Sequence, residues 1–158
     1  MPLGWAIIST GNHPDLKIAP AIAAANDQEL VAVYSRDRGR AQAFAEKHGA
    51  ASAYDSLDDL LEDSRVDAAF IASPNALHSR HALQAAAPGK HVLSEKPMTT
   101  TLEHAVAMVR GRRDYAVKPG TAHHLRPHPR PSMPRGLTAQ GSSAHVSRAQ
   151  PPGCTGLP

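Results

Sequence analysis

Cysteine is almost absent from this chain of 158 residues, in which Cys154 is the only one. A single thiol excludes an internal disulfide and is typical of proteins from a reducing compartment. We therefore expect the protein to be cytoplasmic. Proline, glycine and threonine surround Cys154 and no base stands beside it, so a catalytic role for this thiol is not expected.

Long apolar runs are missing as well. No stretch reaches the roughly 18 consecutive apolar residues that a membrane span requires, and no charged start followed by an apolar segment indicates a signal peptide. No membrane partner is therefore expected. The apolar fraction of 41% is nonetheless sufficient for a hydrophobic core, and the length suits a single domain.

Acidic and aromatic residues are missing from the C-terminal part. Asp114 is the last acidic residue and Tyr115 the last aromatic one. Residues 119–158 contain four arginines, five glycines and eight of the 14 prolines, which exclude a regular helix or central strand around residues 127–134. The net charge is +4 in this tail and −1 in the rest, so the folded part is not expected to bind nucleic acid.

Short apolar runs alternate with helical patterns over residues 1–118. Strands are predicted at residues 5–8, 29–34, 52–54, 67–72 and 90–94, and a sixth strand is expected to begin at 116–117. Helices are predicted at residues 17–26, 39–48, 57–62, 76–87 and 101–113. Gly49 is expected to end the second helix, and Asp55 or Ser56 to cap the third. This alternation indicates an α/β domain with a doubly wound, Rossmann-like parallel sheet that helices cover on both faces.

The turn after the first strand has residues suited to phosphate binding. A dinucleotide fingerprint reads Gly-x-Gly-x-x-Gly, because its glycines allow a tight turn and a close approach of the backbone to the pyrophosphate. Here only Gly11 remains, with Ser9 in place of the first glycine and Pro14 in place of the third. Gly11 and Thr10 are the expected phosphate contacts, in a loop predicted to be longer than the standard turn. His13 either reaches the phosphates or is a solvated loop residue.

The residues after the second strand bear on the choice of cofactor. An acidic residue at this point would hold the ribose 2′-hydroxyl of NAD. Ser35 stands there instead and removes the charge repulsion against a 2′-phosphate, with which the guanidinium of Arg36 can pair. NADP is therefore the predicted cofactor. NAD remains the alternative, because Asp37 is adjacent.

Three features follow one another along the chain: the turn with Gly11, the segment Ile-Ala-Ser-Pro-Asn-Ala-Leu-His at residues 71–78, and His-Val-Leu-Ser-Glu-Lys-Pro at residues 91–97. In this order and at this spacing they resemble the glucose–fructose oxidoreductase / inositol 2-dehydrogenase (Gfo/Idh/MocA) family, from about residue 4 to about residue 117. The resemblance implies an NAD(P)-binding domain in which Lys96 lies beside the nicotinamide and the substrate. Lys96 would then bind substrate and assist proton transfer.

The resemblance also implies roles for other residues of these motifs. Ser73 and Asn75 are expected along the nicotinamide ribose, and Glu95 is expected to orient the ribose or the lysine. Considered without the resemblance, Asn75 could also be an ordinary capping residue at the start of a helix, next to Pro74.

Two histidines lie on one face of the helix predicted at residues 76–87. The resemblance places His78 near the substrate. His78 and His81 are three residues apart and could bind a metal ion together, but no third ligand is specified, so no metal site is expected.

The resemblance covers only part of what the family usually contains. Its members carry a second, substrate-binding domain with an Asp and a His about four residues apart, for which this sequence has no counterpart. We expect the nucleotide-binding domain of an NAD(P)-dependent oxidoreductase that acts on a sugar, cyclitol or related polyol, with little or no turnover by this chain. Intact members can form oligomers. The alternative is a noncatalytic dinucleotide-binding regulatory protein.

We interpret residues 119–158 as a tail, the remnant of the link to the missing domain. Residues 120–129 look like a degenerate form of that link, and disorder is expected beyond about residue 125. A truncation, a shifted reading frame or a decaying gene would each account for this tail.

Overall fold

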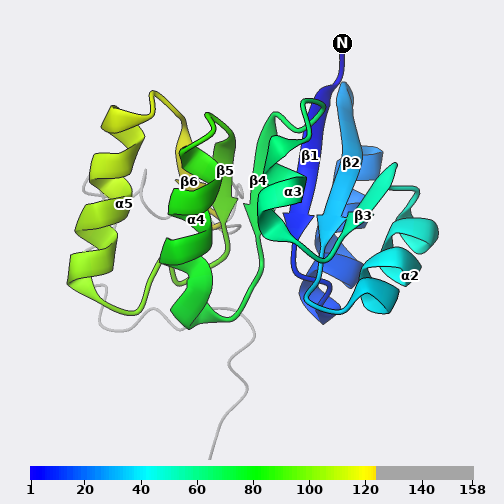
Figure 1. The fold of residues 1–158 in the computed structure, drawn as a ribbon, viewed down its shortest axis with the longest axis horizontal. Helices are drawn as coiled ribbons and strands as arrows, with labels where there is room; N and C mark the ends of the chain where they lie inside the picture. Colours follow the sequence, from blue (N-terminus) through cyan, green and yellow to red (C-terminus); the bar gives the residue numbers. More distant parts are fainter. Residues whose placement is uncertain (124–158) are drawn as a thin grey trace, which may run out of the picture. The chain divides into compact units, whose positions relative to one another are not determined.

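Six parallel strands form one sheet in the computed structural model, which describes residues 1–123 (Figure 1). Their order is β3-β2-β1-β4-β5-β6. The strands are β1 Leu3–Ile8, β2 Gln28–Tyr34, β3 Ser52–Tyr54, β4 Ala68–Ile71, β5 His91–Ser94 and β6 Pro119–Thr121. The helices are η1 Pro14–Ile18 (a π-helix), α1 Ala19–Ala24, α2 Arg38–His48, α3 Leu57–Glu62, η2 Asn75–Leu77 (a 3₁₀-helix), α4 His78–Ala86 and α5 Leu102–Asp114. The predicted α/β, doubly wound fold is confirmed.

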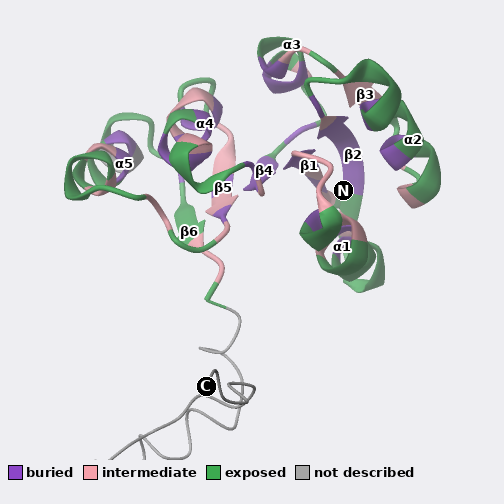
Figure 2. Cartoon of the chain, turned by 90° about the horizontal axis from the view of Figure 1, so that it is seen from below, coloured by how far each residue is buried: buried purple, intermediate pink, exposed green. Residues whose placement is uncertain are grey.

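Helices cover the sheet on both faces, so the central strands are apolar on both sides. In Figure 2, α3, α4 and α5 lie on one side of the strands and α1 on the other. Successive residues of a strand point to opposite faces, and Ile7 and Ile8 are accordingly both inaccessible to solvent, in different cores. Leu60 of α3 belongs to the core of Ile8, whereas Phe44 of α2 belongs to that of Ile7.

Side chains at the helix ends explain why several boundaries are predictable. The carboxylate of Asp37 accepts a hydrogen bond from the amide of Arg40 at 2.9 Å, which caps the start of α2. Gly49 ends that helix with a left-handed φ of 70°, as predicted. Of the two candidate caps for α3, Ser56 is the one that accepts from the helix, at the amide of Asp59.

The first helical segment begins earlier than predicted. Residues are helical from position 12, directly after Gly11, whose carbonyl accepts a hydrogen bond from the amide of Asp15 at 3.1 Å. The expected long loop and the helix start at residue 17 are therefore wrong. Proline is compatible with the first turn of a helix, because the amide that it lacks needs no partner there. Pro14 thus lies within the start of the helix, where it is buried.

The sixth strand begins later than predicted. Residues 116–117 precede it, and β6 pairs with β5 only from Pro119, opposite Val92. Ala116 has a positive φ of 54°, so the chain is still turning away from the end of α5 at that point. Cys154 lies outside the described residues, and so does the segment beyond about residue 125 for which disorder is predicted.

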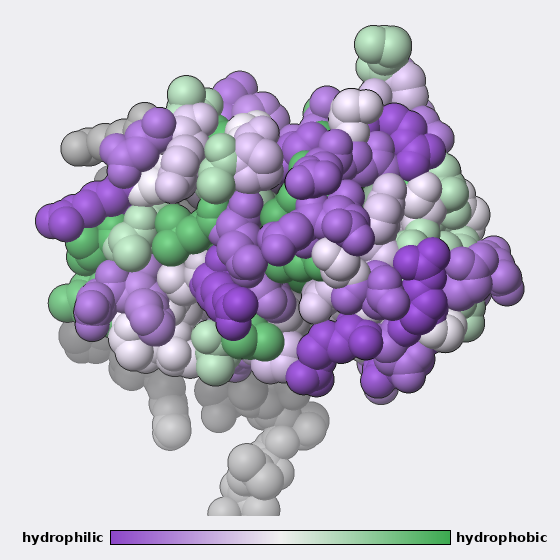
Figure 3. Space-filling model, viewed as in Figure 1, coloured by the Kyte–Doolittle hydropathy of each residue, from purple (hydrophilic) through white to green (hydrophobic). Residues whose placement is uncertain are grey.

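One side of α5 leaves apolar side chains in contact with solvent. Leu102, Val106 and Val109 are exposed, whereas Met108 is buried in the core. Figure 3 shows hydrophobic side chains gathered in the region of α5. Within residues 1–123, no helix is long and apolar enough to cross a membrane.

Replacing Ser9 by glycine is expected to stabilise the fold by about 1 kcal/mol. Ser9 has a φ of 107°, which side chains with a Cβ rarely adopt, and it occupies the position of the first fingerprint glycine. Thermal unfolding followed by circular dichroism should show a melting temperature a few degrees higher. Ser9→Ala is the matched control, because it removes the hydroxyl and keeps the strain. A glycine variant no more stable than the alanine variant would contradict this account.

Candidate functional site

The motifs singled out in the sequence meet at one edge of the sheet. In the strand register Ile8 lies opposite both Tyr34 and Ile71, and Ile71 lies opposite Ser94. The strands β1, β2, β4 and β5 are parallel and therefore end at the same level. The chain order reverses between β1 and β4, because β1 leads towards β2 and β4 leads towards β5. Ligands of open α/β sheets bind at such a switch point, beyond the carboxyl ends of the strands.

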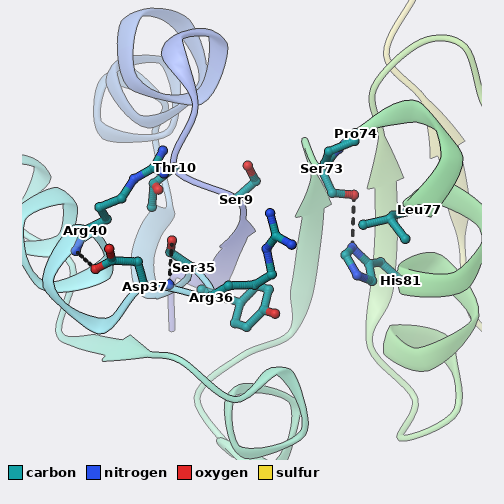
Figure 4. A pocket seen from close by; sticks show the side chains of 11 residues that line it. Ser9, Thr10, Ser35, Arg36, Asp37, Arg40, Ser73, Pro74, Leu77 and His81 are labelled. Carbon is teal, nitrogen blue, oxygen red and sulfur yellow. Dashed lines mark hydrogen bonds between the residues drawn. The ribbon is translucent and has the colours of Figure 1, made fainter.

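A pocket of about 460 Å³ opens at this edge, within the range usual for ligand sites (Figure 4). Four of the residues predicted to bind the cofactor line it, namely Thr10, Ser35, Arg36 and Ser73. The lining also includes Ser9, Tyr34, Asp37, Arg40, Pro74, Leu77 and His81. In Figure 4, Thr10 and Arg40 lie on one side of the pocket and His81 lies on the opposite side.

Two arginines that line the pocket, Arg36 in the turn after β2 and Arg40 in the first turn of α2, have no carboxylate partner among residues 1–123. Among residues 1–123, neither Arg36 nor Arg40 takes part in an ion pair, whereas Arg38 pairs with Asp55 at 3.3 Å. Asp37 does line the pocket, but one oxygen of its carboxylate accepts the amide of Arg40 in the helix cap. This arrangement favours an anionic ligand. The sequence signal that could have indicated Arg40 is its place in the first turn of the helix that follows Ser35 and Arg36.

The turn at Gly11 leaves room for a phosphate. A Cβ atom built on Gly11 would meet no heavy atom within 4 Å, and its φ is not in the left-handed region. Neither packing nor backbone conformation within the described residues therefore requires glycine at this position. The helix begins at the next residue, and the first amides of a helix attract anions. The turn thus fits the pyrophosphate of a dinucleotide.

Glu95, Lys96 and His13 form a second cluster beyond β5. Nε2 of His13 lies 2.8 Å from Oε1 of Glu95, a contact that sequence reasoning missed. The other carboxylate oxygen of Glu95 accepts the amide of Lys96 at 2.9 Å and lies 3.7 Å from its Nζ. The side chain of Lys96 is about half exposed (52%), so its amine can reach a ligand. The peptide bond between Lys96 and Pro97 is cis.

Two histidines of α4, His78 and His81, contact the loop after β4. His78 is buried, and its two ring nitrogens lie 2.7 Å from the carbonyl oxygens of Ser73 and Pro97. Nδ1 of His81 lies 2.9 Å from the hydroxyl of Ser73. Burial above all, and then the neighbouring charges of Arg80 and His78, lower the pKa of His81.

Asn75 follows Pro74, which lines the pocket, but Asn75 itself is not among the lining residues, and neither are Gly11 and Glu95. Asn75 is exposed at the start of η2, so its contact with a cofactor stays a prediction, as does contact between His78 and a substrate. In the part of the chain that the structure describes, no three histidine, cysteine, aspartate or glutamate side chains are grouped so that they could hold a metal ion.

Known proteins are similar to this chain in sequence and in fold. The chain is 37% identical over 122 residues to 1,5-anhydro-D-fructose reductase of Ensifer adhaerens, covering 77% of the chain and 36% of that protein. It is 41% identical over 105 residues to scyllo-inositol 2-dehydrogenase (NADP(+)) of Bacillus subtilis, covering 66% of the chain and 32% of that protein. The crystal structure of a 3-ketoreductase from Actinomadura kijaniata, in complex with TDP-benzene and NADP, superposes with a TM-score of 0.83 at 28% identity.

That superposition covers 89% of this chain and 44% of the ketoreductase. The chain therefore spans less than half the length of these three proteins. Residues 3–119 match the family model of the Gfo/Idh/MocA proteins, which is described as "Oxidoreductase family, NAD-binding Rossmann fold". The chain belongs to the Gfo/Idh/MocA oxidoreductase family, of which it carries the NAD-binding Rossmann-fold domain.

Proposed function

We propose that this chain binds NADP(H) at the edge of the sheet where β1, β2, β4 and β5 end. The observation that carries the proposal is the pocket in which Arg36 and Arg40 have no carboxylate partner among the described residues. A 2′-phosphate would neutralise both charges, and Ser35 adds a hydroxyl without a competing negative charge. The names of the Bacillus subtilis dehydrogenase and of the Actinomadura kijaniata complex, which both include NADP, support the same choice.

The remaining contacts follow from the strand order. Thr10 and Gly11 follow β1, which lies between β2 and β4, and are assigned to the pyrophosphate. Lys96 follows β5, on the other side of β4 from that turn, and is assigned to the nicotinamide end of the site together with Glu95. A bound nicotinamide would supply the hydride acceptor or donor. Lys96 would then bind the reacting oxygen of a substrate and hold or move its proton.

The substrate class is proposed from the named relatives. The names of the 1,5-anhydro-D-fructose reductase and the scyllo-inositol dehydrogenase include a sugar derivative and a cyclitol, and the name of the 3-ketoreductase states reduction of a keto group. We assign the intact protein to hydride transfer at a carbon–oxygen centre of a sugar, cyclitol or related polyol. This chain alone is proposed to bind the dinucleotide with negligible turnover, because no acid follows Asp114 to supply the family's acid/base pair.

Arg36→Ala is expected to weaken NADPH binding about tenfold or more, and NADH binding much less. A lost charge-assisted hydrogen bond costs about 1–3 kcal/mol, and only NADPH carries the 2′-phosphate. Both cofactors are titrated against wild-type and variant chains by the fluorescence of the reduced nicotinamide.

Arg38→Ala is the matched control for this experiment. Arg38 lies two residues on, is exposed, pairs with Asp55 and does not line the pocket, so its removal should leave both affinities nearly unchanged. Equal losses of NADPH and NADH affinity in Arg36→Ala would refute the assignment of the 2′-phosphate. Tighter binding of NADH than NADPH by the wild-type chain would favour NAD as the cofactor.

A further inference from the structure

Few apolar contacts hold the helical turn that follows Gly11. Within residues 11–17 only Pro14 is buried, whereas the side chain of Leu16 is 65% exposed. The carbonyl of Gly11 accepts the amide of Asp15 at 3.1 Å, which closes the turn but does not attach it to the rest of the fold. A segment with so little buried apolar surface needs other contacts to hold its position. This turn is the one assigned to the pyrophosphate.

The side chain of Asp15 connects the turn to the last turn of α2. Its Oδ1 accepts a hydrogen bond from Nε2 of His48 at 2.6 Å, and its Oδ2 accepts one from Nζ of Lys47 at 2.8 Å. A carboxylate can only accept, so the ring nitrogen of His48 is the donor. The hydrogen bonds from Lys47 and from His48 lower the pKa of Asp15, so its carboxylate is ionised at neutral pH. Both carboxylate oxygens are therefore engaged by α2.

The two partners of Asp15 differ in how firmly they are held. The side chain of His48 is only 11% exposed, and its ring centre lies 4.5 Å from that of Phe44. Phe44 is buried in the same core as Ile7. Lys47 is more than half exposed, and an exposed ion pair contributes little by itself. His48 is therefore the partner through which the core fixes Asp15.

The other end of α2 lies at the pocket. Arg40, in the first turn of this helix of 11 residues, lines the pocket together with Arg36. We propose that Asp15 is a positioning residue, which ties the turn at Gly11 to the end of α2 and so fixes the pyrophosphate contacts relative to the two arginines. The tie is a property of the chain alone, whereas its consequence for ligand binding rests on the proposed function.

Nuclear magnetic resonance of the full, ¹⁵N-labelled chain tests the tie without any ligand. In Asp15→Ala, the backbone amide signals of Thr10 and Gly11 are expected to shift, whereas that of Ser73 stays in place. Asp58→Ala is the matched control, because Asp58 is an exposed acid in the first turn of α3, on the other side of the sheet from α1, and its loss should move none of these signals. A folded Asp15→Ala chain with wild-type signals of Thr10 and Gly11 would overturn the tie.

Titrations with two ligands separate positioning from a general loss of structure. NADPH carries both the pyrophosphate and the 2′-phosphate, whereas 2′-AMP carries only the 2′-phosphate. In Asp15→Ala, the affinity for NADPH is expected to fall at least about fivefold and that for 2′-AMP to change by less than about twofold, because only the pyrophosphate contacts are displaced. Asp15→Asn keeps one acceptor oxygen and should restore part of the affinity for NADPH.

Equal losses of affinity for NADPH and 2′-AMP would overturn the positioning role, because Asp15 would then support the pocket as a whole. An unchanged affinity for NADPH in folded Asp15→Ala would overturn it as well. If Asp15→Ala did not fold, Asp15→Asn would be compared with the wild type in the same way. If the wild-type chain bound neither ligand, the proposed function would fail, while the signals of Thr10 and Gly11 would still test the tie.

Discussion

Gly11→Val is expected to weaken NADPH binding by at least about 100-fold while the circular dichroism spectrum and the melting temperature stay close to those of the wild type. The new side chain meets nothing within the described chain, because no heavy atom lies within 4 Å of the Cβ position. It would instead fill the space in which the pyrophosphate approaches the backbone. Fluorescence titration and thermal unfolding together measure the two expectations.

Gly49→Ala is a control with the opposite expected effects, a lower stability and an unchanged affinity for NADPH. Gly49 ends α2 with a φ of 70°, so a Cβ there strains the backbone and should cost about 1 kcal/mol of stability. It does not line the pocket, so the folded variant should bind NADPH as the wild type does. A Gly11→Val chain that keeps near-wild-type affinity would show that the phosphates bind elsewhere.

Lys96→Met is expected to lower the rate of polyol or sugar dehydrogenation by about 10²–10⁴, the range for a positioned proton-transfer group. The test requires a chimera in which the second half of a full-length relative is joined in frame after about residue 126. Absorbance of the reduced nicotinamide then follows turnover by the chimera, by its Lys96 variant and by the chain alone. The chain alone should show negligible turnover.

Lys118→Met in the same chimera is the matched control, because Lys118 is exposed and precedes β6 at the far edge of the sheet from the pocket. Equal turnover rates of the chimera and its Lys96→Met variant would show that Lys96 does not belong to the proposed site. Brisk turnover by the chain alone would mean that the acid/base groups lie within it. Binding without turnover in every form would favour the noncatalytic, regulatory alternative.

Local signals in the sequence account for most of the fold. The strand Ser52–Tyr54 and the helix Leu57–Glu62 are found at their predicted bounds, because an apolar run, a cap and a turn coincide there. The first helix begins earlier than predicted because the residues between Gly11 and Lys17 are predicted as a long loop, although the proline among them also suits a helix start. Family membership, predicted from three motifs, is confirmed by the match over residues 3–119.

Contacts between distant segments account for what the sequence did not reveal. His13 meets Glu95, and His78 meets Pro97, only because β1, β4 and β5 lie side by side and end at one level. A sequence pattern indicates that such residues follow strands, but it does not indicate which loops then touch. For the same reason the side-chain roles of Lys96, Asn75 and Glu95 stay predictions.

The double position of Asp37, at the pocket and at the start of α2, has a consequence for protein engineering. Turning this carboxylate towards a ribose, as a redesign for NAD would require, takes it away from the amide of Arg40 and leaves the helix uncapped. Loss of such a cap typically costs about 1 kcal/mol of stability. Cofactor preference and thermal robustness are therefore coupled at this residue, and an acid introduced at position 35, with Arg36 and Arg40 removed, is the route that avoids the trade-off.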